Sequence, residues 1–344
     1  MNRIARLSGP PYHFLSRVTE VHGPALVLRA GSQVVAEYDV PPEVWYLEQN
    51  DHPVMPMGIL LEAALQAGGW LASYVGSALG RGEELLFRNL EGSGRSHREV
   101  GPARTLRTTT TLTEVATAGE TIIETFGIQR HVEDQLVFDL TTDFGFFTPR
   151  SLRHQVGLPV TDADRAALTE PSDFRVDLTA GRQRTGRPRL PGPMLLMLDR
   201  ATGYWPTGGS AGLGRLRAEK DVDGNEWFFR AHFFQDPVQP GSLGVQAIYQ
   251  LLRFYVVESG LADQVEHPRF EPVRLGSELS WSYRGQVVPE NRLVTVELDV
   301  LEVGTDPRGP YVRAQGWLWV DGKRIYHLPS VSTRVVAGDG PGRG

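Results

Sequence analysis

The sequence predicts an α+β protein made of two copies of one unit, each a curved antiparallel sheet wrapped round one long helix. Three observations lead to this fold class. Two parts of the chain repeat each other at a constant offset, each copy contains one long apolar helical segment, and the remainder alternates apolar and polar residues as strands do.

The repeat is clearest at the motif Pro-Val-x-Pro, which begins at Pro53 and again at Pro237. The offset between these prolines is 237 − 53 = 184, and the offset between the glutamines Gln66 and Gln250 is the same, 250 − 66 = 184. The register of the two copies therefore holds through the segment that follows each motif.

A connector rich in Pro, Gly and Arg separates the two copies. Its arginine cluster, Arg182, Arg184, Arg187 and Arg189, is typical of a solvated linker. We expect a first unit at residues 1–150, a linker at 151–190, a second unit at 191–337 and a flexible tail at 338–344.

Each predicted element has its own signal. Residues 25–40 alternate around a Gly-Ser turn, which predicts a hairpin. A helix should begin at the second proline of each motif, since proline is tolerated in a first helical turn. Residues 59–75 are apolar nearly all round, so this helix must be enclosed. Strands are expected at 105–115, 121–144, 290–303 and 311–328, with turns at 133–135 and 321–323.

One helix enclosed by a curved antiparallel sheet is the hotdog arrangement. A tandem pair would place the two sheets side by side as a pseudo-dimer within one chain, so the predicted architecture is a double hotdog. Further dimerisation of the whole chain is left open by the sequence. The glycine-rich residues 208–214 are interpreted as a hairpin turn rather than a phosphate-binding loop, since no helix follows them.

Composition narrows the classes of function. The chain of 344 residues has no cysteine, which excludes disulfides, thiolate metal sites and a cysteine nucleophile. Its net charge of −6 and lack of a basic cluster interleaved with aromatics argue against a nucleic-acid partner. Residues 57–75 approach the length of a membrane span but contain Glu62 and Gln66, so we expect a buried core helix and no membrane span. The N-terminus lacks the apolar core of a secretory signal, so a cytoplasmic location is expected.

Two residues that differ between the copies are candidates for catalysis. Nine residues past the motif proline the first copy has Glu62 and the second has Gln246. A carboxyl group in an apolar helix is costly unless it is paired or functional, and burial favours its neutral form. The second copy instead has His232, five residues before Pro237, and the first copy has no histidine there.

The first copy lacks the histidine and the second copy lacks the carboxyl group. These differences are complementary, so they predict one composite active site and one second site that has lost its catalytic residues, the relic. If the two helices lie antiparallel, His232 faces Glu62. In the relic, Gln246 faces Glu48, when residues are counted from Pro53, or Asn50, when they are counted from Trp45. His52 matches Asp236 and is a weaker catalytic candidate.

A histidine base and a protonated glutamate facing each other could dehydrate a 3-hydroxyacyl thioester without metal or cofactor. The base would remove the proton next to the thioester carbonyl, and the acid would protonate the departing hydroxyl. Backbone N–H groups at Gly241 and Ser242, where the second helix begins, could stabilise the negative thioester oxygen. Gln66, and Gln250 in the second copy, could position the acid or water, or simply pack.

The residues around His232 resemble a known family. The segment HFFQDPVQPGSLGVQAIYQLLRFY, followed by YRGQVVP, resembles the bacterial beta-hydroxydecanoyl-carrier-protein dehydratases. WYLEQNDHPVMPMGILLEAALQ resembles the first half of the dehydratase domains of polyunsaturated fatty acid synthases. The resemblance implies a hotdog fold, a catalytic histidine at His232, its acidic partner at Glu62 and an oxyanion donor at Gly241. It also implies a phosphopantetheine-linked acyl chain on an acyl carrier protein, with other synthase domains as partners.

The sequence leaves several functional alternatives open. A hotdog thioesterase and a non-catalytic acyl-binding pseudo-dehydratase would share the fold. Isomerisation of the 2-trans product to the 3-cis olefin is assigned to no residue. An acidic carrier protein would dock on arginines, for which Arg230 and Arg253 are weak candidates.

Overall fold

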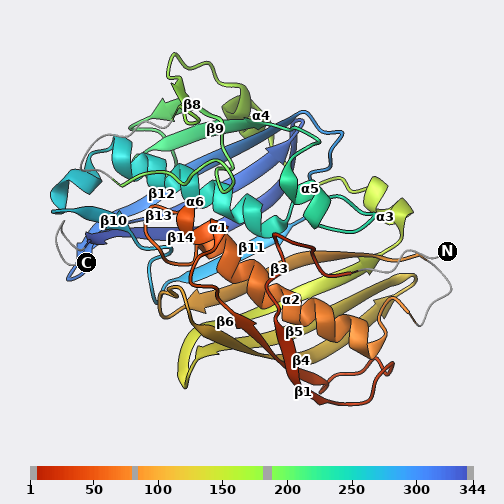
Figure 1. Cartoon of the computed structure of the whole chain (residues 1–344). Coiled ribbons are helices and arrows are strands. Elements are labelled where there is room, and N and C mark those ends of the chain that lie inside the picture. The colour runs from red at the N-terminus through yellow and green to blue at the C-terminus, as the bar shows by residue number, and fades with distance from the viewer. Residues whose placement is uncertain (1–5, 80–83, 181–187, 339–344) are drawn as a thin grey trace.

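One continuous antiparallel sheet forms the framework of the protein. The computed structural model describes residues 6–79, 84–180 and 188–338. Thirteen strands follow one another in the order β1, β2, β4, β5, β6, β3, β11, β14, β13, β12, β9, β8 and β7, and β10 pairs with β14. Figure 1 shows the sheet in two halves, each curved round one long helix.

The first unit supplies the strands of one half. They are β1 (Arg17–His22), β2 (Gln33–Asp39), β3 (Leu86–Ser96), β4 (Thr105–Ala118), β5 (Thr121–Val132) and β6 (Gln135–Phe147). Between β2 and β3 lie the short helix α1 (Trp45–Glu48) and the long helix α2 (Met57–Val75).

The second unit repeats this order after a connecting segment. The connection contains α3 (Pro149–Arg153), α4 (Asp162–Thr169) and β7 (Val176–Asp177). The strands are β8 (Arg200–Trp205), β9 (Arg215–Asp221), β10 (Pro268–Phe270), β11 (Glu278–Tyr283), β12 (Leu293–Asp306), β13 (Gly309–Val320) and β14 (Lys323–Ala337). Between β9 and β10 lie α5 (Trp227–Ala231), α6 (Gly241–Glu258) and the 3-10 helix η1 (Leu261–Gln264).

Both long helices begin directly after the second proline of the repeated motif, with Pro56 and Pro240 as their N-cap residues. All but three residues of α2 and all but three of α6 are buried. Each fully buried Leu, Ile or Val stabilises the fold by about 1.5–3 kcal/mol. Among the described helices none is long and apolar enough to cross a membrane.

The two units join along β3 and β11, which pair antiparallel from Glu278 opposite Arg95 to Ser282 opposite Glu91. The helices pack across the same joint. A Cβ atom on Gly58 would lie 2.7 Å from the carbonyl oxygen of Ser242, so the first turns of α2 and α6 approach almost in backbone contact. The predicted double hotdog, with two sheets side by side, is confirmed.

The predicted strands after each helix correspond to β4, β5, β6, β12, β13 and β14, and residues 208–214 connect the paired strands β8 and β9. The predicted hairpin at 25–40 is wrong in its first strand. β2 pairs instead with β1, which lies upstream. Leu26 has a positive φ of 59°, and its N–H donates to the carbonyl of Tyr74, so this apolar segment folds over the end of α2.

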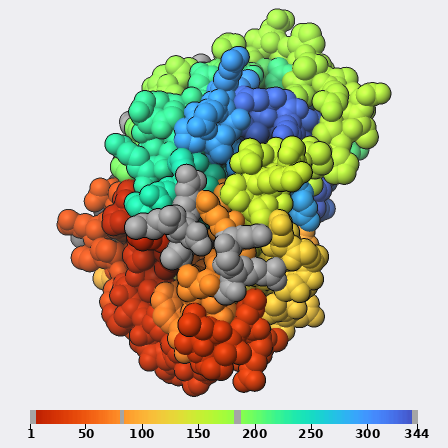
Figure 2. Space-filling view, turned by 90° about the vertical axis from the view of Figure 1, so that its right-hand side faces the viewer, coloured from red at the N-terminus to blue at the C-terminus, as the bar shows by residue number. Residues whose placement is uncertain are grey.

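The segment expected as a linker lies on the second unit. Arg324 pairs with Asp164 at 3.1 Å, and Arg217 donates to the carbonyl of Leu168 at 2.7 Å. Figure 2 shows this yellow-green segment on the surface beside the blue strands. Arg189 pairs with Asp51. The other cluster arginines, Arg182, Arg184 and Arg187, and tail residues 339–344 lie outside the described residues.

Candidate active site

A cavity lies at the joint and receives side chains from both units. Glu62 and Gln66 reach it from α2, whereas His232 and Gly241 reach it from the second unit. The cavity, with its opening to solvent, encloses about 840 Å³. The structure thus brings Glu62 and His232, which lie in different copies of the repeat, to the walls of one space.

Glu62 is buried and its carboxyl group is held by three side chains. Ser242 Oγ donates to Oε2 at 2.8 Å, while Gln66 Nε2 and Ser8 Oγ lie 3.1 Å and 3.4 Å from Oε1. Burial raises the pKa of Glu62, and the hydrogen bonds from Gln66, Ser242 and Ser8 oppose that rise. Burial therefore favours the neutral acid, whereas the three hydrogen bonds favour the ionised carboxylate.

The hydroxyl of Ser242 connects Glu62 to a tyrosine. Tyr12 Oη lies 2.9 Å from Ser242 Oγ, and because Ser242 donates its one proton to Glu62, Tyr12 is the donor in this bond. Burial and the nearby Glu62 raise the pKa of Tyr12 well above its ordinary value. The phenol therefore stays protonated, and the three groups form a continuous chain of hydroxyls ending at the carboxyl.

His232 lies on the loop between α5 and α6 and is also buried. Its Nδ1 lies 3.0 Å from the carbonyl oxygen of Val238. Since a carbonyl only accepts, Nδ1 carries the proton of the neutral ring and Nε2 keeps a free lone pair. Burial lowers the pKa of His232 to about 3, and the charge of Arg88 acts in the same direction. The imidazole is therefore neutral at neutral pH.

An ion pair between the units holds the loop of His232. Arg88, on β3, binds Asp236 through two hydrogen bonds, 2.6 Å from Nη1 to Oδ2 and 2.9 Å from Nη2 to Oδ1. Arg88 Nε also donates to Gln286 at 2.7 Å. This bidentate geometry fixes both position and angle, so the first unit positions the loop on which the second unit carries its histidine.

The first turn of α6 lies against the cavity beside Tyr283. A Cβ atom on Gly241 would lie 2.6 Å from Tyr283 Cε2, so position 241 has no room for a side chain. The buried hydroxyl of Tyr283 has no hydrogen-bond partner among the described residues. Both groups line the cavity, which gives it a helix N-terminus and a polar hydroxyl close together.

Comparison with known proteins places this arrangement in a family. The model of the FabA-like domain matches residues 7–141 and 190–328. The chain belongs to the FabA-like domain family. The family resemblance expected from the sequence is therefore confirmed.

Relatives of this FabA-like chain include a polyunsaturated fatty acid synthase subunit of Thraustochytrium sp., 30% identical over 332 residues. That match covers 89% of the present chain and 22% of the relative, so the chain spans about a fifth of the relative's length.

Two solved structures share its fold. The dehydratase domain from the CurF module of curacin polyketide synthase has a TM-score of 0.54 at 12% identity, covering 95% of this chain and 100% of that one. An oleoyl thioesterase (putative) from Lactobacillus plantarum has a TM-score of 0.51 at 11% identity, covering 91% and 100%.

The FabA-like chain has a second, pseudo-symmetric site with different residues. Asn50 Nδ2 donates to the carbonyl of Val54 at 2.9 Å, as His232 Nδ1 does to Val238, and 238 − 54 = 184. Asn50 is therefore the counterpart of His232, whereas Glu48 is exposed. The sequence left open whether Glu48 or Asn50 corresponds to His232. The hydrogen bond to Val54 favours Asn50, which is the residue found by counting from Trp45.

Gln246 occupies the place of Glu62 in that second site. It is fully buried, and its Oε1 accepts from the backbone N–H of Gly58 at 3.1 Å. Gly58 is the counterpart of Ser242, since 242 − 58 = 184, so the hydroxyl that binds Glu62 has no equivalent here. The two positions that correspond to Glu62 and His232 therefore carry neither a carboxyl nor an imidazole.

The side chains of Gln66 and Gln250 each make hydrogen bonds to the backbone of their own unit. Gln66 binds the backbone of Tyr12 and Phe14, and Gln250 binds that of Leu195 and Met197. Only Gln66 also reaches a carboxyl group. A packing role is therefore common to both copies, and positioning of the acid is added in the first.

Arg253, which the sequence suggested as a docking residue for a carrier protein, does not lie at the surface. Arg253 is buried and donates to the carbonyls of Glu271 and Pro272, so it cannot dock a carrier protein. Arg230 is exposed. His52 lies partly buried near the start of α2.

Sequence reasoning missed Ser8, Tyr12, Arg88 and Tyr283, because each comes from a segment far from the motif. Within the described ranges, no cluster of three or more His, Asp or Glu side chains could hold a metal ion.

Proposed function

We propose that this chain dehydrates a 3-hydroxyacyl thioester, carried on the phosphopantetheine arm of an acyl carrier protein, to the 2-enoyl thioester. The observation that carries the proposal is that Glu62 of the first unit and His232 of the second line one cavity. The dehydratase domain named in the CurF structure and the fatty acid synthase relative support the same class of reaction and the presence of partner domains.

His232 is the base. Its neutral ring carries a proton on Nδ1 and offers Nε2 to the proton on the carbon next to the thioester carbonyl. The electron pair of that C–H bond forms the new double bond, and the bond from the β-carbon to the hydroxyl breaks.

Glu62 is the acid. Burial raises its pKa, which favours the protonated form needed to turn the departing hydroxyl into water. After the reaction His232 holds one extra proton and Glu62 has lost one. Transfer of that proton through water restores both groups, so the products are the enoyl thioester and one water molecule.

The first turn of α6 stabilises the thioester oxygen as it becomes negative. Helix N-termini present free backbone N–H groups and the positive end of the helix dipole. Gly241 and Ser242 lie at this position. Tyr283 lines the same cavity and offers a further hydroxyl donor to the substrate.

The test is turnover of a 3-hydroxyacyl thioester on a carrier protein or a pantetheine mimic, followed as the enoyl product. His232→Ala and Glu62→Gln should each lower kcat by about 10²–10⁴-fold, the usual contribution of a general acid or base. Asn50→Ala and Gln246→Ala change the counterparts in the second site and serve as matched controls, with activity retained.

Three other outcomes would contradict the proposal. Release of free carrier thiol without enoyl product would indicate a thioesterase. Binding of the thioester with no turnover would indicate a pseudo-enzyme. Equal losses of kcat in Gln246→Ala and Glu62→Gln would mean that catalysis is not confined to the site that contains Glu62. Chromatography of the released acyl chain in the same assay reports any 2-trans to 3-cis isomerisation.

A further inference from the structure

Strands β1 and β8 are equivalent, but only β8 is covered on its outer edge. Figure 1 shows them at opposite ends of the sheet. Arg17 of β1 lies opposite Glu37 and Arg200 of β8 lies opposite Glu219, with 200 − 17 = 183, and both pairings contain a bulge just beyond. β8 has β7 on its other side, whereas β1 has β2 as its one partner strand among the described residues.

An extended segment, residues 172–178, forms the cover on β8. Its strand β7 pairs antiparallel with β8, and just beyond it the N–H of Leu178 donates to the carbonyl of Asp199 at 2.9 Å. Ser16 is the counterpart of Asp199, since 199 − 16 = 183, and the N–H of each donates to the neighbouring strand at 2.8 Å. The carbonyl of Ser16 therefore takes the place of the acceptor used by Leu178.

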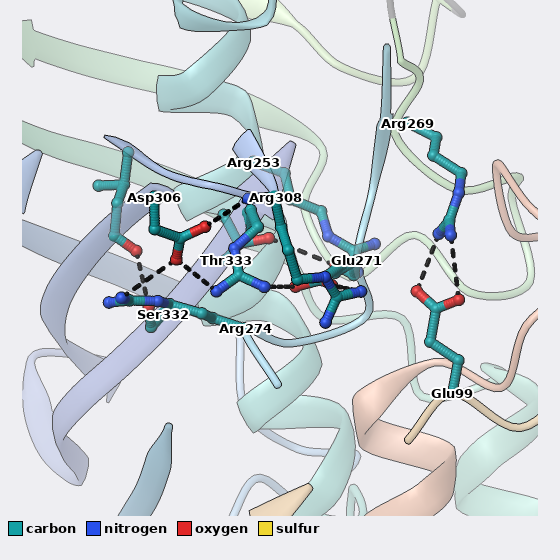
Figure 3. A network of polar contacts seen from close by, with 11 residues as sticks. Glu99, Arg253, Arg269, Glu271, Arg274, Asp306, Arg308, Ser332 and Thr333 are labelled. Carbon is teal, nitrogen blue, oxygen red and sulfur yellow. Dashed lines mark hydrogen bonds and ion pairs between the residues drawn. The ribbon is translucent and has the colours of Figure 1, made fainter. Parts of the chain in front are cut away.

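The same segment also covers one turn of α6. Phe174 packs on Tyr204 of β8 with 5.6 Å between ring centroids and on Phe254 of α6 with 6.2 Å. The neighbouring Arg253 is buried and donates to the carbonyl of Glu271 at 3.2 Å (Figure 3). This turn of α6 is thus enclosed by polar contacts at Arg253 and by an aromatic ring at Phe254.

The corresponding surface of the first unit is open. Trp70 is the counterpart of Phe254, since 254 − 70 = 184, and Val21 is the counterpart of Tyr204, since 204 − 21 = 183. Phe254 is 5% exposed, whereas Trp70 and Val21 are both half-buried. None of the six residues of β1 is buried, in contrast to three of the six in β8.

Apolar surface continues from Trp70 to the loop after β1. Tyr74 stacks on Trp70 with 5.4 Å between centroids, and its carbonyl accepts from the N–H of Leu26 at 2.9 Å. Leu26 is 67% exposed. Single exposed apolar residues are common, but a contiguous group beside an unpaired strand edge is typical of an interaction surface.

We propose that β1 and Trp70 bind an extended segment of a partner polypeptide, which adds a strand to the sheet and places an aromatic side chain on Trp70. Residues 172–178 show the chemistry that fits. They carry an aromatic residue followed by branched apolar residues at every second position, namely Phe174, Val176 and Leu178.

Charge and composition specify the partner further. Asp177 lies opposite Arg200, so an acidic residue in the partner segment would lie opposite Arg17. The β1 strand of a second copy, RVTEVH, has no aromatic residue to place on Trp70, so the partner is a different segment. Neither β1 nor Trp70 lines the cavity that contains Glu62, so this binding surface goes beyond the proposed dehydration.

The test uses a labelled peptide of residues 170–180, EPSDFRVDLTA, as the probe of this surface. Titration with the full chain, followed by fluorescence anisotropy, should give saturable binding with a Kd below about 1 mM. Hydrogen exchange should slow in β1 and in the turn of α2 around Trp70 when the peptide binds. Exchange in β8 should not change, because that strand is already covered.

Variants of the peptide and of the chain locate the contact. The peptide with Phe174→Ala and the chain with Trp70→Ala should each raise Kd by at least about tenfold, since an aromatic contact is lost. Methylation of the Leu178 nitrogen removes one main-chain donor and should raise Kd by about 2–10-fold. Phe234→Ala removes another exposed aromatic side chain, 56% exposed, and should leave Kd unchanged.

Four results would overturn the inference. They are no saturable binding up to about 1 mM, equal binding of the peptide with Phe174→Ala, protection of β8 in place of β1, and a concentration-dependent dimer in which β1 is protected without peptide. The last would assign the edge to a second copy. If Trp70→Ala does not fold, Val18→Lys places a charge on the edge of β1, and an unchanged Kd in that variant would count against the proposal equally.

Discussion

Ser242 Oγ donates a hydrogen bond of 2.8 Å to Glu62 Oε2, so the first turn of one unit's helix holds the acid carried by the other unit's helix. The contact spans 180 residues of sequence. It joins the helix N-terminus that we propose as the partner of the thioester oxygen to the group that we propose as the acid. Two parts of the proposed chemistry are therefore fixed relative to each other by one side chain.

Ser242→Ala should shift the pH dependence of catalysis. The Ser242 bond lowers the pKa of Glu62, so its loss should raise that pKa further. Glu62 must be protonated to act as an acid, so the alkaline limb of the kcat profile should move to higher pH. Tyr12→Phe should cause a smaller shift, since Tyr12 reaches the carboxyl only through Ser242. Profiles identical to wild type would show that the hydroxyl chain does not tune the acid.

The pair of Arg88 and Asp236 should be coupled in catalysis. Its side chains are 10% and 19% exposed, so little solvent screens the two hydrogen bonds that hold the His232 loop. In a double-mutant cycle with alanine at each position, kcat/KM should show a coupling of about 1.5–3 kcal/mol, as for a charged hydrogen bond.

The exposed pair of Arg17 and Asp39 is the control for that cycle. Their side chains are 48% and 50% exposed and lie on the outer strands β1 and β2, so their coupling in kcat/KM should be near zero.

Removal of Arg88 should also raise the pKa of His232, because the arginine charge lowers it. The acidic limb of kcat/KM in Arg88→Gln should therefore move to higher pH. Independent effects of Arg88 and Asp236 would contradict the positioning role.

Glu124 should make stability fall as the pH rises. This carboxyl group on β5 is fully buried, and burial raises its pKa to about 7 from the ordinary 4.5. The folded state then binds more protons than the unfolded chain between these two values, so its free energy of unfolding decreases with pH across this window. The full difference is about 3 kcal/mol, at 1.36 kcal/mol for each pKa unit.

Glu124→Gln removes the titration and keeps the shape of the side chain. Urea unfolding at several pH values from 5 to 8 should show the difference in unfolding free energy between wild type and variant shrinking at low pH. Comparison with the variant is needed because His232, whose pKa is lowered, changes stability in the opposite direction with pH. A difference that does not vary with pH would exclude Glu124 as the titrating group.

The sequence by itself determined the architecture, because both of its signals are local. The apolar run of α2 and the alternation in β4, β5, β12 and β13 follow from which residues avoid water. The constant offset between the two Pro-Val-x-Pro motifs and the residues that follow them made the second unit a copy of the first. The same offset singled out Glu62 and His232, because the other copy has a different residue at each of the two corresponding positions.

Tertiary structure alone decided which distant groups meet. Tyr12 and Arg88 lie in segments without a local signal, and Tyr283 lies in one that showed only the family resemblance. All three reach the cavity because β3 pairs with β11 and the long helices cross at Gly58. The same holds for Arg253, which the sequence suggested as a surface arginine. Its burial depends on Glu271 and Pro272, whose carbonyls replace water around the guanidinium. Periodicity shows which face of an element is buried, but the partners across the core are set by packing in three dimensions.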